Sequence, residues 1–335
     1  MTEPNISVVV IGRNEGARLV RCLESVRNMR WSGAIELIYC DSNSGDGSAD
    51  RARAFGSRVV EIGTGRLTAA RARNAGWQLS SAPFILFLDG DTILHPEFVT
   101  NGMAKFNDDP RIAVVWGHRR EMHPEASLYN RILDLDWIYE PGLTEFCGGD
   151  ALMRRVAVQR AGGFNPDLIA GEEPDLCRRI RANGELILHI DAPMTGHDLA
   201  MTNWREYWMR AVRGGYAYAE IAALYRNTSD PLWASTSRSN VIRACIYVIA
   251  PAAAILIALV LRSWVAILLF LFCAAALIGR TAIRARRKHG SFATLILFAV
   301  HSHVQHIPVF VGQLRYRTIA GRHGRSELIE YKRPA

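Results

Sequence analysis

The first part of the chain alternates short apolar runs with helical patterns. The apolar runs are "ISVVVI" at 6–11, "IELIYC" at 35–40 and "FILFL" at 84–88. After the first of them, Leu19, Leu23 and Val26 recur at the spacing of one helix face. Strands that alternate with helices predict an α/β fold, in which a mostly parallel sheet is flanked by helices.

The run at 84–88 leads directly into two acids. It is bounded by Pro83 and Gly90, a pattern typical of a strand buried on both faces. Asp89 and Asp91 then lie at the carboxyl end of this strand, the edge of an open α/β sheet where ligands bind. Two acids beside a glycine are also common in solvated turns, so other motifs must support the site.

Two uncharged segments follow near the other end of the chain. The first, at 244–261, covers about 27 Å as a helix at about 1.5 Å per residue, close to the roughly 30 Å of a bilayer core. The second, at 264–279, comes after Arg262 and Ser263. A single run of this length is typical of a core helix, whereas two in tandem favour a transmembrane hairpin.

A third apolar segment, at 292–311, contains polar residues that are unfavourable in lipid, among them His301, His303 and His306. Five basic residues in "RTAIRARRK" precede it, and such residues mark the cytoplasmic side of a membrane. We therefore expect membrane-associated C-terminal helices in which the third segment is interfacial or re-entrant. Packing of the histidines against protein remains an alternative.

The patterns predict four regions along the chain. We expect a cytoplasmic catalytic domain at 1–200, interfacial amphipathic linker helices at 201–240 and a transmembrane hairpin at 241–280. A basic loop, the interfacial or re-entrant helix and a cytoplasmic tail occupy 281–335. The N-terminus has no basic and apolar signal sequence, so the expected location is the inner membrane with the catalytic domain in the cytoplasm.

Charge and cysteine content narrow the class of partner. The net charge of +8 gathers partly beside the apolar segments, which indicates contact with anionic membrane lipids and not with nucleic acid. The six cysteines are widely spaced, and no two of them form a Cys-x-x-Cys pair, which argues against a zinc site and a disulfide framework. They are Cys22, Cys40, Cys147, Cys177, Cys245 and Cys273.

Further polar motifs follow predicted strands and helices. Asp41 ends the strand before the polar turn "SNSGDGS", which suits a nucleoside. In "ARARNAG", Arg73 and Asn74 are placed where a guanidinium could reach a base or a phosphate. With "VVVIGRNE", "FLDGD", "CGGDALMRR", "GGFN" and "GEEPDLCRRIRANG", the set resembles the family-2 glycosyltransferases of the GT-A fold over roughly residues 5 to 200.

The resemblance implies a donor site and a metal site. Asp41 would accept from the base of a nucleotide sugar, with Glu15 and Arg73 nearby, while Asp89 would face the ribose and Asp91 the metal. The implied donor-binding set is Arg13, Glu15, Asp41, Arg73, Asp89, Asp91 and Asp150, and the implied ligands of Mg²⁺ or Mn²⁺ are Asp91, Asp89 and His197. His197 has a structural role as its alternative, since a lone histidine is more often structural. Asp150 would bond sugar hydroxyls, unless "CGGD" is only a tight turn.

An inverting transfer also needs a general base for the acceptor hydroxyl. The family usually places it in a Glu-Asp pair before a short helix, and this chain has Glu172-Glu173-Pro174-Asp175. Glu173 stands where aspartate is usual and is the implied base, with Glu172 and Asp175 as alternatives. Acids are also favoured in the first turn of any helix that begins near a proline.

The predicted function is therefore a membrane-anchored inverting glycosyltransferase of cell-envelope or exopolysaccharide synthesis. The expected donor is a nucleotide sugar, a UDP-sugar first, and the expected acceptor is a polyprenyl phosphate or a glycan-lipid. A processive polysaccharide synthase is the alternative, although Arg210 and Arg213 stand without the Gln-x-x-Arg-Trp motif. A nucleotidyltransferase lacks its glycine- and lysine-rich loop, and a non-catalytic scaffold is disfavoured by the intact acids. The sugar, the linkage and the oligomeric state stay open.

Overall fold

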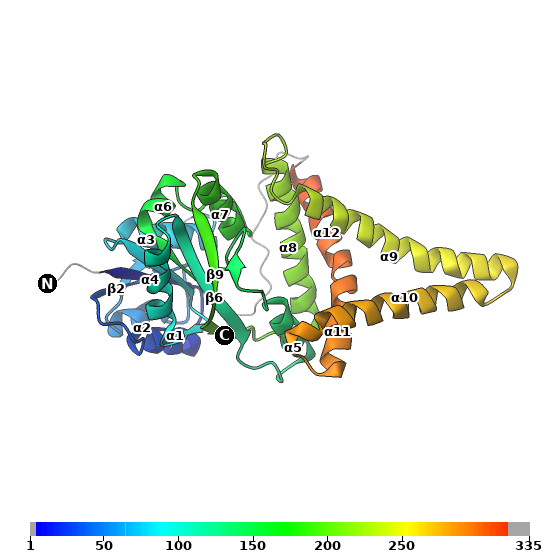
Figure 1. Ribbon diagram of the computed structural model, residues 1–335, viewed down its shortest axis with the longest axis horizontal. Coiled ribbons are helices and arrows are strands. Elements are labelled where there is room, and N and C mark those ends of the chain that lie inside the picture. The colour runs from blue at the N-terminus through cyan, green and yellow to red at the C-terminus, as the bar shows by residue number, and fades with distance from the viewer. Residues whose placement is uncertain (1–4, 64, 321–335) are drawn as a thin grey trace. The chain divides into compact units, whose positions relative to one another are not determined.

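The computed structural model describes residues 5–63 and 65–320 of the 335-residue chain (Figure 1). The described residues form two compact units. One lies within Met1–His123 and Trp137–Ala200, and the other within Pro124–Asp136 and Met201–Tyr331. The predicted tail beyond residue 320 lies outside the described residues.

The first unit is built on a nine-stranded sheet in the order β3-β2-β1-β4-β8-β6-β9-β5, with β7 paired to β9. The strands are β1 (Ile6–Gly12), β2 (Ile35–Asp41), β3 (Arg58–Glu61), β4 (Phe84–Asp89), β5 (Thr92–Leu94), β6 (Ile112–Glu121), β7 (Gly142–Leu143), β8 (Ala151–Arg154) and β9 (Leu186–His197). The strands β3, β2, β1 and β4 are parallel, whereas β8 is antiparallel to both of its neighbours. The expected α/β fold is confirmed, with a mixed sheet in which β6 and β9 are also parallel and β5, β7 and β8 pair antiparallel to their neighbours.

Helices flank this sheet in Figure 1. They are α1 (Ala17–Arg27), α2 (Ser48–Ala54), α3 (Ala69–Leu79), α4 (Phe98–Asp108), α6 (Arg155–Arg160) and α7 (Glu172–Ala182). The strand that the opening pattern predicted is β4, whose Ile85, Leu86, Phe87 and Leu88 have no exposed surface. Burial on both faces is therefore confirmed.

The register of the strands brings the acids to one edge. In the parallel strands, Ile11 pairs with Asp89 on β4, and Gly12 pairs with Asp41 on β2. On the other side, β5 runs antiparallel to β9 and places Thr92 opposite His197. Residues from three distant parts of the chain thus meet where β2, β4 and β9 end.

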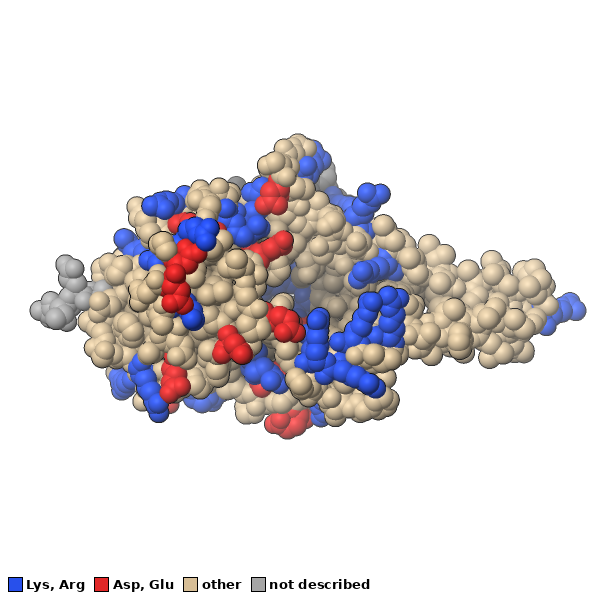
Figure 2. All heavy atoms as spheres, in the orientation of Figure 1, with Lys and Arg blue, Asp and Glu red and all other residues tan. Residues whose placement is uncertain are grey.

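The second unit is helical. Its elements are α5 (Leu128–Asp136), α8 (Trp204–Leu224), α9 (Ala234–Leu261), α10 (Val265–Arg284), the short 3₁₀ helix η1 (Ala285–Lys288), α11 (Phe292–Val304) and α12 (His306–Ala320). Three segments are long and apolar enough to cross a membrane: Ala234–Leu261, Val265–Lys288 and Phe292–Ile319. Figure 2 shows almost no charged residue along the α9–α10 hairpin and basic residues near its base.

The third of these segments differs from the other two in its surroundings. Within its most apolar stretch of 18 residues, 44% is buried inside the protein. The corresponding shares are 17% for the first segment and 6% for the second. His301 bonds the Tyr207 hydroxyl through Nδ1 at 2.7 Å and the Asp136 carboxylate through Nε2 at 3.0 Å. His303 bonds the Tyr247 hydroxyl at 2.6 Å. The histidines therefore face protein, the alternative that the sequence left open.

Helices α8 and α12 approach each other at two glycines. A Cβ at Gly215 would lie 1.9 Å from the Val309 carbonyl oxygen, and a Cβ at Gly312 would lie 2.0 Å from that of Val212. Only glycine permits such contact between backbones. The third apolar segment is therefore packed closely on α8, a helix that carries charged residues along its length.

Candidate active site

Three potential metal ligands converge where β4 and β9 end. Ligand atoms of Asp89, Asp91 and His197 all lie within 4.8 Å of one another, and His197 Nε2 is 3.5 Å from Asp91 Oδ1. Two carboxylates and an imidazole suit a divalent cation such as Mn²⁺, and carboxylate oxygens also suit Mg²⁺. The residues present thus fit the metal that the sequence predicted.

The loops that follow β1 and β2 are tied to each other. Asp41 is almost fully buried, and its carboxylate accepts from the Ser44 amide at 2.7 Å and from the Tyr39 hydroxyl at 3.0 Å. The Asn14 amide donates to Ser44 Oγ at 2.8 Å, and Asn14 Oδ1 accepts from the Gly45 amide at 2.9 Å. These bonds fix the rim on which a nucleoside was predicted.

Arg13 and Glu15 stand on the first of these loops. Arg13 is exposed, while Glu15 is partly buried and pairs with Arg18 at 3.0 Å. The Glu15 side chain also comes within 3.3 Å of a Cβ built at Gly90, the glycine between the two strand-end acids. The structure therefore brings Glu15 beside the acids of β4.

The Arg73 side chain is enclosed by acidic groups. It is 2% exposed. One guanidinium nitrogen donates to Asp89 Oδ1 at 2.8 Å, and the other donates to Glu172 Oε1 at 2.8 Å. Carboxylates enclose the guanidinium in this structure, and its contact with a base or a phosphate stays a prediction.

Asp150 is also buried, and its side chain has no exposed surface. Its carboxylate accepts from the Asp89 amide at 2.9 Å, from Arg119 at 2.8 Å and from the Thr195 hydroxyl at 2.9 Å. Through the bond to the Asp89 amide, Asp150 orients the end of β4. Its bonds to sugar hydroxyls stay a prediction.

The acids at the start of α7 have three different environments. Glu172 is buried against Arg73, and Asp175 is buried against Arg179 with a contact of 2.5 Å. Glu173 remains 18% exposed and lies 3.5 Å from Arg73. Burial, together with the neighbouring charge of Glu172, raises the pKa of Glu173 to about 7, against the opposing effect of Arg73. Glu173 therefore combines partial exposure with a pKa suited to proton transfer near neutrality.

Parts of this chain resemble known proteins. Residues 7–160 match the family model described as "Glycosyl transferase family 2". These residues resemble family 2 glycosyltransferases. The chain is 27% identical over 221 residues to validoxylamine A glucosyltransferase of Streptomyces hygroscopicus subsp. jinggangensis, covering 54% of this chain and 52% of that protein. It is 26% identical over 246 residues to pre-mycofactocin glycosyltransferase of Mycobacterium tuberculosis, covering 68% and 50%.

The chain thus spans about half the length of these curated relatives. Among solved structures, it resembles the mannosyltransferase PcManGT from Pyrobaculum calidifontis in complex with GDP-Man and Mn²⁺. The two are 18% identical, with a TM-score of 0.61 over 90% of this chain and 87% of that one. This likeness shows the fold, and the expected GT-A fold is confirmed.

Sequence reasoning missed two residues of the first unit. Arg119, on β6, contacts Asp150, and its guanidinium carbon lies 5.6 Å from the Trp137 ring centroid. The Trp137 ring also lies 5.0 Å from that of His197. The signal for Arg119 was a strand that continues past "IAVVW" into charged residues, the same signal that marked Asp89.

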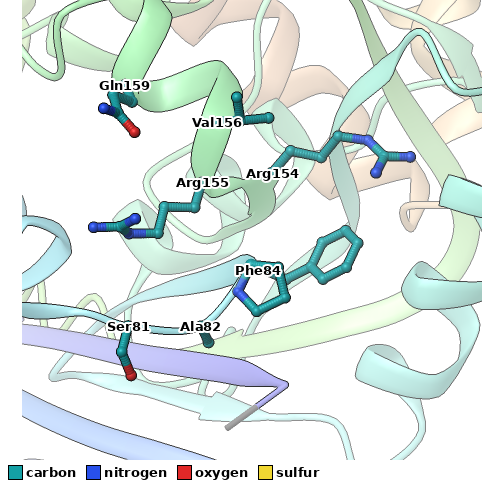
Figure 3. Close-up of a pocket in the computed structure, with 8 residues that line it drawn as sticks. Ser81, Ala82, Phe84, Arg154, Arg155, Val156 and Gln159 are labelled. Atoms are coloured by element: carbon teal, nitrogen blue, oxygen red, sulfur yellow. The ribbon is translucent and has the colours of Figure 1, made fainter. Parts of the chain in front are cut away.

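A separate hollow of about 330 Å³ lies at the opposite end of β4 in the first unit. It is lined by Ser81, Ala82, Pro83, Phe84, Arg154, Arg155, Val156 and Gln159 (Figure 3). Phe84 begins the strand that ends at Asp89, so this hollow is remote from the acids. None of the predicted site residues lines it.

Proposed function

We propose that this protein is a membrane-anchored inverting glycosyltransferase that moves a sugar from a nucleotide-sugar donor to a lipid-linked acceptor. One observation supports this most directly. Glu173, with a pKa of about 7, lies 3.5 Å from Arg73. Arg73 in turn contacts Asp89, a member of the group formed by Asp89, Asp91 and His197. A base and an anion-stabilising site side by side are what inverting transfer requires.

The donor half of the site uses the strand ends and their loops. Asp89, Asp91 and His197 would hold Mg²⁺ or Mn²⁺, which when bound offsets the negative charge of a diphosphate leaving group. Asp41 and Glu15 would contact the nucleoside from the tied loops. Of the nucleotide sugars, a UDP-sugar stays our first expectation.

The acceptor half is centred on Glu173. As a carboxylate it can take the proton of an acceptor hydroxyl while the sugar is transferred, and its own partial exposure leaves that oxygen accessible. A phosphate acceptor is already ionised and needs no base. The raised pKa of Glu173 therefore favours a hydroxyl of a glycan-lipid over a polyprenyl phosphate as the acceptor.

The α9–α10 hairpin supports the membrane anchor. Its large apolar side chains are exposed, including Leu259 at 71% and Phe272 at 73%, and such a surface is unfavourable in water. Basic residues at 280–288 stand at the base of the hairpin and would contact anionic lipid. We propose that the base of the hairpin lies on the cytoplasmic side of the inner membrane. The third apolar segment, which packs against α8, would lie at the membrane interface.

Donor binding by the purified full-length protein tests this function. Thermal unfolding is followed in detergent with a panel of UDP-, GDP- and dTDP-sugars, with and without Mn²⁺. One nucleotide class should stabilise the protein only with Mn²⁺, by about 2.7 kcal/mol at a concentration of 100 times its Kd. A panel in which no nucleotide sugar shifts unfolding would contradict the proposal.

A further inference from the structure

Two neighbouring residues of α3 join the two halves of the active site. Arg73 bridges Asp89, at the end of β4, and Glu172, at the start of α7, with both contacts at 2.8 Å. The planar guanidinium can bond two carboxylates at once, whereas a lysine ammonium is a single point of charge. Because Asp89 belongs to the metal-ligating group and Glu172 adjoins Glu173, Arg73 connects the donor side to the acceptor side.

Asn74 makes a second connection, to the loop that leads into α7. Its Nδ2 donates to the Phe164 carbonyl at 2.7 Å, and its Oδ1 accepts from the Phe164 amide at 2.9 Å. The Trp77 indole also donates to Oδ1 at 2.8 Å. The side-chain amide thus pairs with one backbone residue as a neighbouring strand would, which fixes both its orientation and that of the loop.

The same loop is held to α3 and the segment before it at further points. Arg66 donates to the Asp167 carbonyl at 2.8 Å. Gly163 has a φ of +74°, and a Cβ there would lie 2.8 Å from Asn74 Oδ1, so the motif "GGFN" is what lets the loop approach. The segment that aims Glu173 is therefore fixed from α3.

We propose that Arg73 and Asn74 are positioning residues, which hold the helix that carries Glu173 in register with the strand end that carries Asp89 and Asp91. Neither side chain contacts the donor. This inference rests on the proposed function, since it assigns a role within the same site. It predicts that changes at these two positions lower turnover while donor affinity is retained.

The test uses full-length Arg73→Lys and Asn74→Asp, with the nucleotide sugar that the panel identifies. Aspartate keeps an oxygen that accepts from the Phe164 amide. Its second oxygen replaces the Nδ2 donor and faces the Phe164 carbonyl without a hydrogen bond. Both variants should lose at least 10-fold in kcat, whereas the Kd for the donor with Mn²⁺, measured by calorimetry, should change less than 3-fold. The exposed Asn101→Asp on α4 is the matched control and should change neither value.

A 10-fold weaker donor Kd with unchanged kcat would show that these residues are donor ligands and would overturn the proposal. Unchanged kcat and Kd would overturn it as well. If a variant does not fold, Arg66→Ala replaces it in the test, because Arg66 is partly exposed and also bonds the loop that leads into α7. We expect this variant to lower kcat by a smaller factor while the Kd for the donor stays constant.

Hydrogen exchange gives a readout that needs no substrate. Amides of 172–182 should exchange at least 10-fold faster in Asn74→Asp than in the wild type or Asn101→Asp. Equal exchange would contradict positioning. A wild type that binds no donor, with the expected exchange difference still present, would refute the proposed function and leave the connection between α3 and α7 standing.

Discussion

Replacing Glu173 by glutamine should abolish turnover and stabilise the protein above neutral pH. In the folded protein, burial and the charge of Glu172 raise the pKa of Glu173 from its ordinary value of 4.5 to about 7. Above pH 7 the folded state must hold this carboxylate ionised in an unfavourable place. Glutamine has nearly the same shape and no charge, so it removes the unfavourable term together with the base.

The magnitude follows from the pKa difference. Below pH 4.5 both folded and unfolded states are protonated there, so Glu173 has no effect on stability. Between pH 4.5 and 7 the unfolded chain releases the proton and the folded state retains it, so stability falls as pH rises, by about 3 kcal/mol in total for a shift of this size. Glu173→Gln should therefore gain up to about 3 kcal/mol at pH 8 and little at pH 4.5.

The assay compares thermal unfolding of the two full-length proteins in detergent from pH 4.5 to 8, alongside kcat at pH 8. We expect the difference in stability to grow with pH and kcat to fall at least about 10²-fold, as is typical when a general base is removed. Glu172→Gln serves as the control, because it takes a buried partner from Arg73 and should destabilise the protein. A pH-independent difference for Glu173→Gln would refute the raised pKa, and retained turnover would refute the base.

Three further predictions address the rest of the site and the membrane. Asp91→Asn should remove stabilisation by a nucleotide sugar with Mn²⁺ while the protein remains folded, as thermal unfolding without ligand would show; an unchanged Mn²⁺ effect would exclude it as a ligand. Gly149→Ala should lower kcat at least 10-fold, because its Cβ would lie 2.7 Å from Arg73 Nη2 and 2.9 Å from Asp89 Oδ2. Full activity would mean that these two side chains can move aside without loss of function. A reporter fused after Ala335 should be active only on the cytoplasmic side, and an external signal would establish three spans.

The local pattern was sufficient to predict the elements that carry the site. Five apolar residues ahead of Asp89 indicate a strand buried on both faces, and β4 has that form. Long uncharged runs likewise predict the hairpin, since the length of an apolar helix is a local property. Parallel strands have their carboxyl ends at the same edge of the sheet. The direction of the strands is therefore enough to predict that Asp41 and Asp89 lie at one edge.

Only the tertiary structure decided which of these residues meet and which are enclosed. The antiparallel pairing of β5 with β9 brings His197 to Asp91, and no local preference encodes that pairing. Burial of Arg73 and Asp150 among protein groups likewise could not be read from the sequence. Charge, reach and hydrogen-bonding capacity belong to a side chain and can be read from its identity, whereas exposure and pKa depend on neighbours that the fold supplies.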